Sequence, residues 1–524
     1  MADIRIVYNA INALVSGADE AAKRVIQQAL SYEIDGAGYA TPTWDGKSTM
    51  FDWAGNHFPA GFVTGVVFRL QKAGYRVQVA RKPMVAPLGK PNPVVNGFPF
   101  NPDYAYQDET VERLVKYGGM IAQIATGGGK SIVACKALAR IGRLTLFITT
   151  RSVLMHQMRD NFQASLDWRA ENGEPHLKGA RCGILGEGEF SVSKYVNVAT
   201  VQTLASFMDE PPRDASPAKR SAHLKRREML GRLLKSVSLL VLEEAHEASG
   251  NNFYDIARMC SNADYRLGLT ATPFMKASAE ANMRLMAVSG PIGIRVTEQY
   301  LIEKGILATP YFLYRRCGYR PDAERILTDL KDKLNNTRLG RTSPYQKAYQ
   351  LGIVYNLERN TLIARYAAEF VRRGINAMIL VKHKRHGQIL KEMIASLGVK
   401  VDFIYGESSK KTRLKMLQAL RDGTIDVLIG STILDVGVDV PGVGSIMLAG
   451  GDKAEVELRQ RVGRGLRAKK DRANICFVLD FLDTANNHLL THSYSRKAIL
   501  DSTPGFAENV LPVDGNFPYN LLAA

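Results

Sequence analysis

The chain has 524 residues, a formal net charge of +18 and 46% apolar residues, which suits a globular protein of about three domains with a polyanionic partner. No stretch approaches the ~20 apolar residues of a membrane span, and the start lacks the features of a secretory signal, so we expect no membrane partner. The five cysteines are scattered without a C-x-x-C pair, which predicts reduced thiols in the cytoplasm and no zinc site.

The first ninety residues have strand and helix patterns of their own. Residues 4–8 and 75–79 alternate apolar and polar side chains as strands do, and residues 19–30 and 61–74 repeat apolar positions at helical spacing. We therefore expect residues 1–90 to form a small α+β domain with its own apolar faces. A stretch rich in Pro, Gly and Asn follows and is expected to link this domain to the next one.

A short turn pattern lies inside this small domain. Residues 44–47 read WDGK, and Asp45 with Gly46 predicts a hairpin turn with Trp44 packed on the sheet. Lys47 follows the turn, where it is either a nucleic-acid contact or an ordinary surface lysine.

A glycine-rich loop between an apolar run and a helical pattern is the most informative segment. Residues 120–124 predict a buried strand, residues 125–131 read ATGGGKS, and residues 132–139 predict a helix. Glycines let backbone N–H groups turn toward a phosphate, Lys130 can reach the β- and γ-phosphates, and the Ser131 hydroxyl can hold Mg²⁺. The strict phosphate-loop pattern has Gly where this chain has Ile124, so a glycine-rich turn that binds nothing is the alternative. The candidate phosphate-binding residues are Thr126, Gly127, Gly128, Gly129, Lys130 and Ser131.

A basic stretch follows in the middle of the chain. Residues 209–227 contain the pair Pro211-Pro212 and then a run of lysines and arginines. We interpret this segment as an insertion that forms a solvated surface helix, with a direct phosphate contact as the alternative.

Two apolar strands end in residues suited to nucleotide chemistry. Residues 239–242 read LLVL, typical of a strand buried on both faces, and Glu243 and Glu244 follow at the edge where open α/β sheets bind ligands. One carboxylate there can hold Mg²⁺ and its neighbour can deprotonate a water, although an ordinary acidic helix start is the alternative. The next such strand ends in Thr270 and Thr272.

Arginines recur at i, i+3 and i+6 near the C-terminus, in residues 460–467 (QRVGRGLR). They share one face if the segment is helical. The guanidinium fork matches phosphate oxygens and always stays charged, so this face suits a γ-phosphate better than lysines would. A basic surface helix is the alternative.

In chain order, the glycine-rich loop, the two strand ends and the arginine-rich segment resemble motifs I, II, III and VI of the superfamily 2 helicases of the DExH type. Further segments resemble motifs Ia, Ic, IV and V of the same superfamily, in residues 148–157, 198–204, 379–383 and 430–441. Residues 44–52 and 297–307 resemble segments of the UvsW group of phage recombination helicases. The resemblance implies an α/β fold with two RecA-like lobes that have parallel sheets, over residues 91–309 and 310–524, after the small α+β domain.

The resemblance also assigns roles to individual residues. It implies that ATP and Mg²⁺ bind, with Gln107 on the adenine, Asp439 on the ribose, Ser131 and Glu243 on the metal, and Glu244 as general base. Glu243 stands where the family has Asp. From the second lobe, the resemblance assigns the attacking water and the transferring phosphoryl group to Gln460, Arg464 and Arg467. The residues assigned to nucleic acid are Thr150, Arg151, Thr200 and Thr432, with Lys47 in the small domain.

The activity implied is ATP-driven DNA unwinding and translocation by a monomer. We expect it to remodel forks and junctions, with branch migration, in recombination, replication or repair, in the host cytoplasm if a phage encodes the chain. An RNA helicase and a restriction motor subunit are alternatives within the superfamily. A nucleic-acid-binding protein with an impaired ATPase is an alternative from another class, given Ile124 and Glu243.

Overall fold

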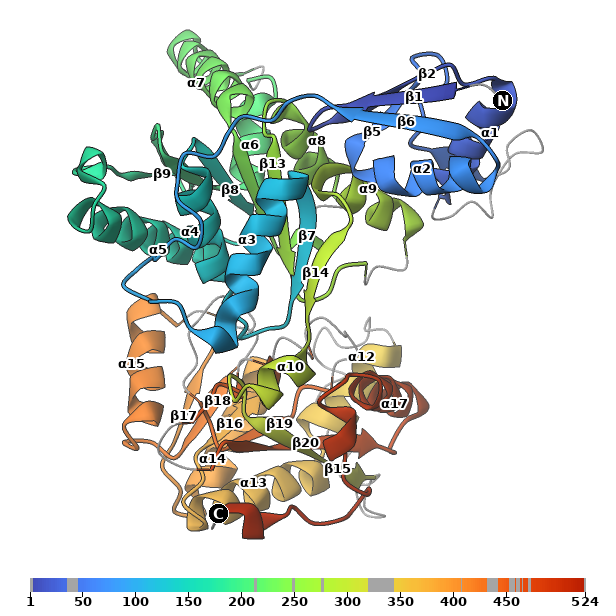
Figure 1. Cartoon of the computed structure of the whole chain (residues 1–524). Helices are drawn as coiled ribbons and strands as arrows, with labels where there is room; N and C mark the ends of the chain where they lie inside the picture. The colour runs from blue at the N-terminus through green and yellow to red at the C-terminus, as the bar shows by residue number, and fades with distance from the viewer. Residues whose placement is uncertain are drawn as a thin grey trace. The chain divides into compact units, whose positions relative to one another are not determined.

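The structure is a computed structural model of the chain (Figure 1). It describes residues 3–34, 46–211, 214–246, 250–274, 278–318, 344–406, 408–430, 442–451, 458, 462–463, 465–469 and 473–522. The contacts group the chain into two compact units, residues 1–124 with 129–296 and residues 125–128 with 297–524. The first unit holds the small domain and the first lobe, and the second holds the second lobe. The domain limits at residues 90 and 309 stay predictions.

The small domain is a four-stranded sheet with two helices. The strands have the order β5-β2-β1-β6, with β1 parallel to β6 and the other pairs antiparallel. The Asp19 carboxylate accepts a hydrogen bond from the Ala22 N–H at 2.7 Å and so begins the first helix, as the apolar spacing predicted. The elements are β1 (Asp3–Tyr8), β2 (Asn12–Ser16), β5 (His57–Pro59), β6 (Arg76–Arg81), α1 (Glu20–Ala29) and α2 (Val63–Lys72).

The predicted hairpin turn at Asp45–Gly46 falls at the border of the described residues, so it stays a prediction. Strand β3 (Ser31–Glu33) pairs antiparallel with β4 (Lys47–Thr49), and the Ile34 N–H donates to the Gly46 carbonyl at 3.0 Å. Gly46 therefore belongs to the ladder, and its φ of 74° is one that glycine adopts readily. Trp44 and Asp45 lie outside the described residues, whereas Lys47 is exposed on β4.

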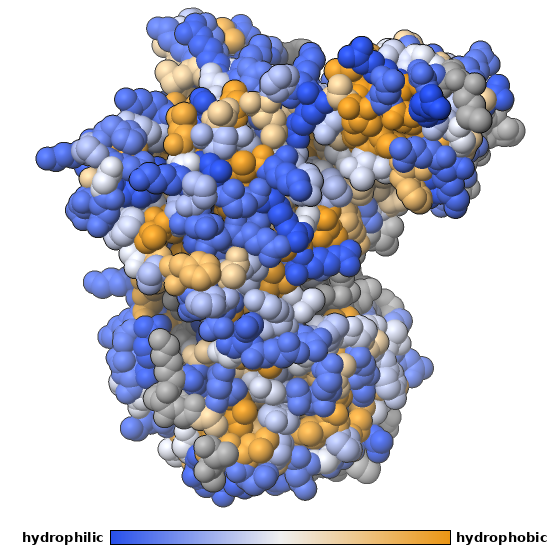
Figure 2. All heavy atoms as spheres, in the orientation of Figure 1, coloured by the Kyte–Doolittle hydropathy of each residue, from blue (hydrophilic) through white to orange (hydrophobic). Residues whose placement is uncertain are grey.

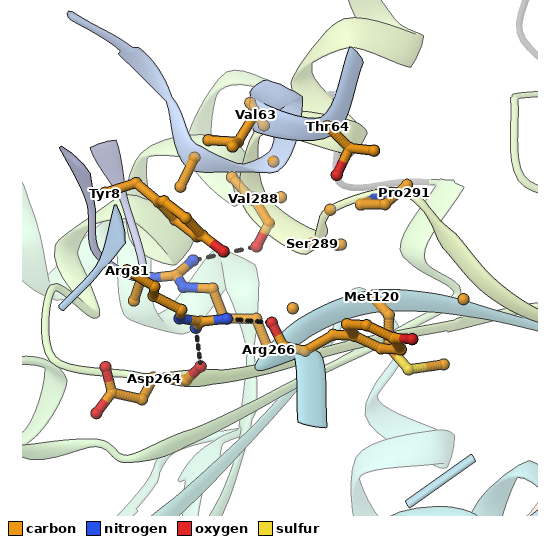
Figure 3. Close-up of a pocket in the computed structure, with 18 of the residues that line it drawn as sticks. Tyr8, Val63, Thr64, Arg81, Met120, Asp264, Arg266, Val288, Ser289 and Pro291 are labelled. Carbon is orange, nitrogen blue, oxygen red and sulfur yellow. Dashed lines mark hydrogen bonds between the residues drawn. The ribbon is translucent and has the colours of Figure 1, made fainter. Parts of the chain in front are cut away.

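The core of the small domain continues into the first lobe. Ala287 is buried in that core, and Met283 and Met286 pack against it from α9 (Ala279–Ser289). Arg81 at the end of β6 stacks over the Tyr8 ring and donates to the carbonyls of Tyr117 and Asp264, beside a cavity of about 330 Å³ (Figure 3). The two parts of this unit thus share apolar packing as well as polar contacts.

The packing of the small domain against α9, which we call the joint, predicts opposite effects on stability when alanine replaces two nearby glycines. A Cβ on Gly61 would lie 1.9 Å from the Met286 carbonyl oxygen, whereas a Cβ on Gly65 in α2 would meet nothing within 4 Å. Gly61→Ala should therefore force the domain off α9 and cost roughly 1–3 kcal/mol, as overpacking does. Gly65→Ala should be neutral or stabilise the helix by up to about 1 kcal/mol. Thermal unfolding measures both, and equal melting temperatures for the two variants would contradict the joint.

The first lobe is built on an eight-stranded sheet with the order β10-β9-β11-β8-β12-β13-β7-β14. All neighbours are parallel except β10, which is antiparallel to β9. The carboxyl ends of the seven parallel strands therefore meet at one edge, where the predicted motifs follow them. The strands are β7 (Gly119–Ile124), β8 (Thr145–Thr149), β9 (Cys182–Gly186), β10 (Glu189–Ser191), β11 (Val196–Thr200), β12 (Leu239–Glu243), β13 (Tyr265–Thr270) and β14 (Ile292–Val296).

Helices complete this lobe, and one of them is the predicted basic insertion. They are α3 (Ala105–Tyr117), α4 (Lys130–Ile141), α5 (Ser152–Glu171), α6 (Val201–Met208), α7 (Pro217–Ser236), α8 (Asn251–Met259) and α9. In α7 the basic residues are solvent-facing while Leu230, Leu233 and Leu234 are buried. The surface-helix interpretation is confirmed, and the phosphate contact stays a prediction.

The second lobe has a fully parallel six-stranded sheet with the order β15-β20-β19-β16-β18-β17. Its buried strands form a core with α13 and α14. The elements are α10 (Glu298–Glu303), β15 (Thr309–Cys317), α12 (Pro344–Tyr349), α13 (Leu357–Arg372), β16 (Ala377–Leu380), α14 (Lys384–Ala395), β17 (Val401–Ile404), α15 (Lys410–Arg421), β18 (Val427–Gly430), β19 (Ser445–Leu448), β20 (Ile475–Asp483) and α17 (Asn487–Asp501).

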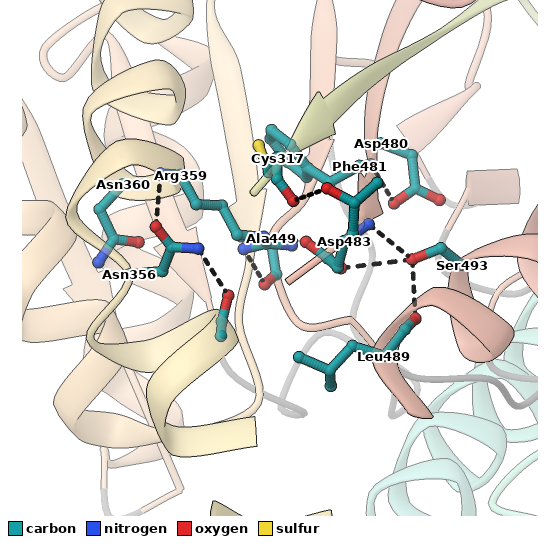
Figure 4. A network of polar contacts seen from close by, with 12 residues as sticks. Cys317, Asn356, Arg359, Asn360, Ala449, Asp480, Phe481, Asp483, Leu489 and Ser493 are labelled. Atoms are coloured by element: carbon teal, nitrogen blue, oxygen red, sulfur yellow. Dashed lines mark hydrogen bonds and ion pairs between the residues drawn. The ribbon is translucent and has the colours of Figure 1, made fainter. Parts of the chain in front are cut away.

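A buried ionic network ties α13 and α17 to the edge of this sheet (Figure 4). Arg359 donates to Asp483 and to the Ala449 carbonyl, each at 2.8 Å, and Arg496 pairs with Asp480 at 2.9 Å. Both arginines are almost completely buried. Asn356 caps α13 next to Arg359, which fixes the helix end to the same network.

Removal of one partner from this network should be costly. Arg359→Ala leaves the Asp483 carboxylate buried beside fewer donors, and we expect a loss of about 3–5 kcal/mol in the free energy of unfolding. Arg372→Ala on the exposed end of the same helix should change it by less than about 0.5 kcal/mol. Urea denaturation of both variants gives the comparison, and similar small losses would show that Arg359 is not essential to the lobe.

The surface seen in Figure 2 is dominated by hydrophilic residues, and apolar residues gather on the small domain. Leu14, Phe68 and Val79 are large apolar side chains that are exposed on the strands and on α2 of this domain. Within the part of the chain that the structure describes, no helix has the length and apolar character to cross a membrane.

Candidate nucleotide site and nucleic-acid-binding face

The glycine-rich loop has the backbone of a phosphate cradle. It joins β7 to α4, and Gly127 and Gly129 have φ values of 88° and 76°, which side chains with a Cβ rarely adopt. Gly129 caps α4, so the free N–H groups of this twelve-residue helix begin at Lys130 and Ser131. Ile124, where the strict pattern has Gly, is fully buried as the last residue of β7. The one residue that differs from the strict pattern therefore belongs to the buried strand, and the turn itself is formed by the glycines that follow it.

Gln107 lies against this loop, as the resemblance suggested. It is buried on α3, and a Cβ on Gly129 would lie 2.5 Å from its Nε2 atom. Any residue larger than glycine at position 129 would displace the amide. The adenine contact of Gln107 stays a prediction.

Two carboxylates and an ammonium group share the end of β12. Glu243 and Glu244 are only 9% and 7% exposed. Burial, followed by the charge of Glu244, raises the pKa of Glu243 to about 8, and the nearby Lys130 acts in the opposite direction. Lys130 donates to the Ile124 carbonyl at 3.3 Å. Paired buried carboxylate oxygens beside a phosphate loop suit a hydrated Mg²⁺, so the residues fit the implied ATP·Mg²⁺.

His246 connects the acidic strand end to the next strand. Its Nδ1 atom lies 3.0 Å from the Thr270 hydroxyl and 3.5 Å from Glu244 Oε2. The Thr270 hydroxyl also accepts from the Thr272 N–H at 3.2 Å. We had assigned no role to His246, although its place two residues after Glu244 was the available signal. The contacts make it the link between the candidate general base Glu244 and Thr270, at the end of the next strand.

The predicted nucleic-acid contacts of this lobe lie together at the ends of β8 and β11. Thr200 is paired with Thr149, and the exposed Gln202 donates to the Thr150 carbonyl at 3.1 Å. Arg151 begins α5 beside them. Gln202 is a polar residue at this face that the sequence reasoning missed.

The second-lobe predictions are described only in part. Thr432, Asp439, Gln460 and Arg464 lie outside the described residues, so their roles stay predictions. Arg467 is exposed and bridges to Leu307 within the same unit.

Comparisons with known proteins agree with this geometry. A family model described as "Type III restriction enzyme, res subunit" matches residues 102–275, and one described as "Helicase conserved C-terminal domain" matches residues 360–469. The ATP-dependent DNA helicase uvsW of Enterobacteria phage T4 is 23% identical over 94% of this chain and 96% of its own length. The DNA 3'-5' translocase XPB2 of Sulfurisphaera tokodaii is 25% identical over 73% of this chain and 82% of its own.

The fold has a counterpart among solved structures. The DUF1998 helicase MrfA bound to DNA and AMPPNP superposes with a TM-score of 0.51, at 13% identity, over 76% of this chain and 50% of that one. The predicted fold class of two RecA-like lobes with a small N-terminal domain is confirmed. With its ordered motifs, both family matches and a similarity to uvsW that spans nearly the whole length of both proteins, the chain belongs to the superfamily 2 helicases and resembles UvsW.

Proposed function

We propose that this helicase is an ATP-driven DNA translocase that remodels forks and junctions in recombination, replication or repair. The observation that carries the proposal is the cluster at the end of β12, where Glu243, Glu244 and Lys130 meet and His246 leads to Thr270. A nucleotide-driven motor needs such a link between the hydrolytic site and a neighbouring strand, because hydrolysis must change the protein's conformation.

The residues of the first lobe divide the chemistry among them. ATP·Mg²⁺, when bound, supplies the phosphoanhydride bond that is hydrolysed. Lys130 and the N–H groups at the start of α4 hold the phosphates, Ser131 and Glu243 hold the metal, and Glu244 takes the proton of the attacking water. His246 orients Glu244, and its contact with Thr270 couples the position of Glu244 to the end of β13.

Further roles are proposed for Gln107 and for residues of the second lobe. Arg464 and Arg467 stabilise the charge on the transferring phosphoryl group in the manner of arginine fingers, and Gln460 positions the water. Asp439 binds the ribose and Gln107 the adenine.

The proposed nucleic-acid contacts read the backbone rather than the bases. Thr150, Arg151, Thr200 and Thr432 lie at motif positions, and hydroxyls, backbone N–H groups and a guanidinium bind phosphates without sequence preference. Lys47 on the exposed β4 strand gives the small domain a contact with a second arm of a branched DNA. The similarity to uvsW and XPB2, both described as acting on DNA, supports DNA as the substrate. We further propose a monomer that acts in the cytoplasm, or in the host cytoplasm if a phage encodes it.

One parallel assay tests the proposal. ATP turnover is measured with single-stranded DNA, duplex DNA, forked DNA and RNA of matched length, and unwinding of the fork is followed in the same reactions. We expect forked DNA to stimulate turnover most and to be unwound. Stimulation by RNA alone would make the chain an RNA helicase, and binding without turnover on any nucleic acid would make it a binding protein with an impaired ATPase.

A further inference from the structure

Aromatic and basic side chains line the carboxyl edge of the second-lobe sheet. They come from four places that are far apart in sequence: the end of β17, the start of α14, helix α12 and helix α17. We call this surface the aromatic stripe, and its members are Tyr405, Lys384, His383, Tyr349, Tyr345 and His492.

One half of the stripe joins α14 to the outermost strand. His383 and Lys384 begin α14 directly after β16, and both are exposed. The Lys384 ammonium lies 4.2 Å from the centre of the Tyr405 ring, and Tyr405 follows β17. A lysine held over an aromatic ring keeps its charge next to a flat apolar surface.

The other half continues the line of rings onto two helices. The ring centre of Tyr349 lies 5.0 Å from that of His383 and 6.2 Å from that of Tyr345, one turn away on α12. Tyr345 in turn lies 5.2 Å from His492 of α17, which packs against α12. The three pairs are inclined by 54–55°, so neighbouring rings do not cover each other's faces as stacked rings would.

Packing explains only part of this arrangement. Tyr349 is 3% exposed and its hydroxyl donates to the Gly450 carbonyl, so it anchors the stripe. Tyr345, His492 and Tyr405 are only half-buried, which a purely structural cluster does not require.

The stripe has the length and chemistry of a binding platform for single strands. Tyr405 follows β17, His383 follows β16, and Tyr349 donates to Gly450 after β19. From Tyr405 to Tyr349 the stripe therefore crosses three strand spacings of about 4.8 Å, roughly 14 Å in all. That is about four nucleotides at a rise of ~3.4 Å per nucleotide. Aromatic faces interleaved with cations are how proteins bind single strands without sequence preference.

We propose that the aromatic stripe stacks the bases of a single nucleic-acid strand, with Tyr345 as its main stacking surface. The inference rests on the proposed function and adds base contacts to the phosphate contacts placed on the first lobe. Lys384 holds the backbone beside Tyr405, and His383 and His492 flank the Tyr345 platform.

The test compares a base-containing strand with an abasic strand of the same length, by fluorescence anisotropy across a salt series. Wild type should bind the base-containing strand more tightly. Tyr345→Ala should weaken that binding at least about fivefold and leave binding of the abasic strand unchanged. Tyr345→Phe keeps the ring and should bind like wild type. Lys384→Gln should instead weaken both strands and lower the salt slope by about one contact.

Tyr494→Ala is the matched control, because Tyr494 lies on the same helix α17 as His492 and is 55% exposed. It should bind both strands as wild type does. Tyr345→Ala that weakens neither strand, or weakens both equally, would overturn the proposal. If Tyr345→Ala melts below wild type, the same comparison on Tyr405→Leu decides it at the other end of the stripe. A wild type that binds no nucleic acid and shows no stimulated turnover would instead refute the proposed function.

Discussion

Lys130→Ala is expected to lower ATP turnover by at least about 10²–10³-fold, the cost of removing one preorganised donor to developing charge. The lysine stands at the first position of α4, and its ammonium faces the buried carboxylate of Glu243. The polar groups of Thr150 and Arg151, proposed to hold nucleic acid, follow a different strand. Binding of DNA should therefore remain within about twofold of wild type, a change of less than ~0.5 kcal/mol.

Two measurements decide this prediction. Turnover is followed with saturating DNA, and DNA affinity is measured without nucleotide. Lys116→Ala, an exposed lysine in the last turn of α3, serves as the control and should keep both activities. Equal loss of turnover and DNA binding in a folded Lys130→Ala protein would defeat the assignment of this lysine to ATP.

A large effect on ATP turnover is also expected from substitution of Glu243, which stands where the family has Asp. Glu243→Asp keeps a carboxylate at the end of β12 and should retain at least about a tenth of the turnover, which corresponds to a rise of up to ~1.4 kcal/mol in the activation barrier. Glu243→Gln removes the charge that faces Mg²⁺ and should lower turnover by at least about 10²-fold. A titration with Mg²⁺ at saturating ATP should show the weakened metal binding of the Gln variant.

Stability separates the chemical effect from a folding defect. Burial and the neighbouring Glu244 raise the pKa of Glu243 to about 8, so without metal its carboxyl group is mostly protonated near pH 7 and the neutral Gln side chain replaces a group of the same charge. Without nucleotide and metal, the Gln variant should therefore melt at or above the temperature of wild type. Turnover of the Gln variant comparable with wild type would move the metal role to Glu244.

The chemical segments were readable in the sequence because each is local. The loop from Ala125 to Ser131 needs only glycines at the positions with positive φ, a preceding apolar strand and a following helix, all within about twenty residues. The same holds for Glu243 and Glu244 after four consecutive apolar residues. Both patterns place polar groups at the carboxyl end of a buried parallel strand, and the eight-stranded sheet, which contains both β7 and β12, confirms that placement.

The sequence patterns did not predict the contacts between segments that are far apart in the chain. The dipeptide Asp45–Gly46 is a local turn signal, and Asp45 lies outside the described residues, whereas the ladder contact between Ile34 and Gly46 depends on a pairing across the chain. The apolar faces of the small domain were visible, but the close approach of Gly61 to Met286 could not be inferred from either segment alone.

The division between the two kinds of information follows from the range of the interactions. Backbone conformation, helix caps and strand burial depend on neighbours in sequence, so composition and spacing sufficed for the phosphate loop and the acidic strand end. The two-lobe α/β class was implied by the resemblance of the ordered motifs to a known superfamily. The buried Arg359–Asp483 pair joins residues 124 positions apart, and the ring of Tyr345 meets His492 from another helix. Such pairs exist only after the sheet has brought its strand ends together, because long-range contacts are set by packing and topology rather than by local propensity.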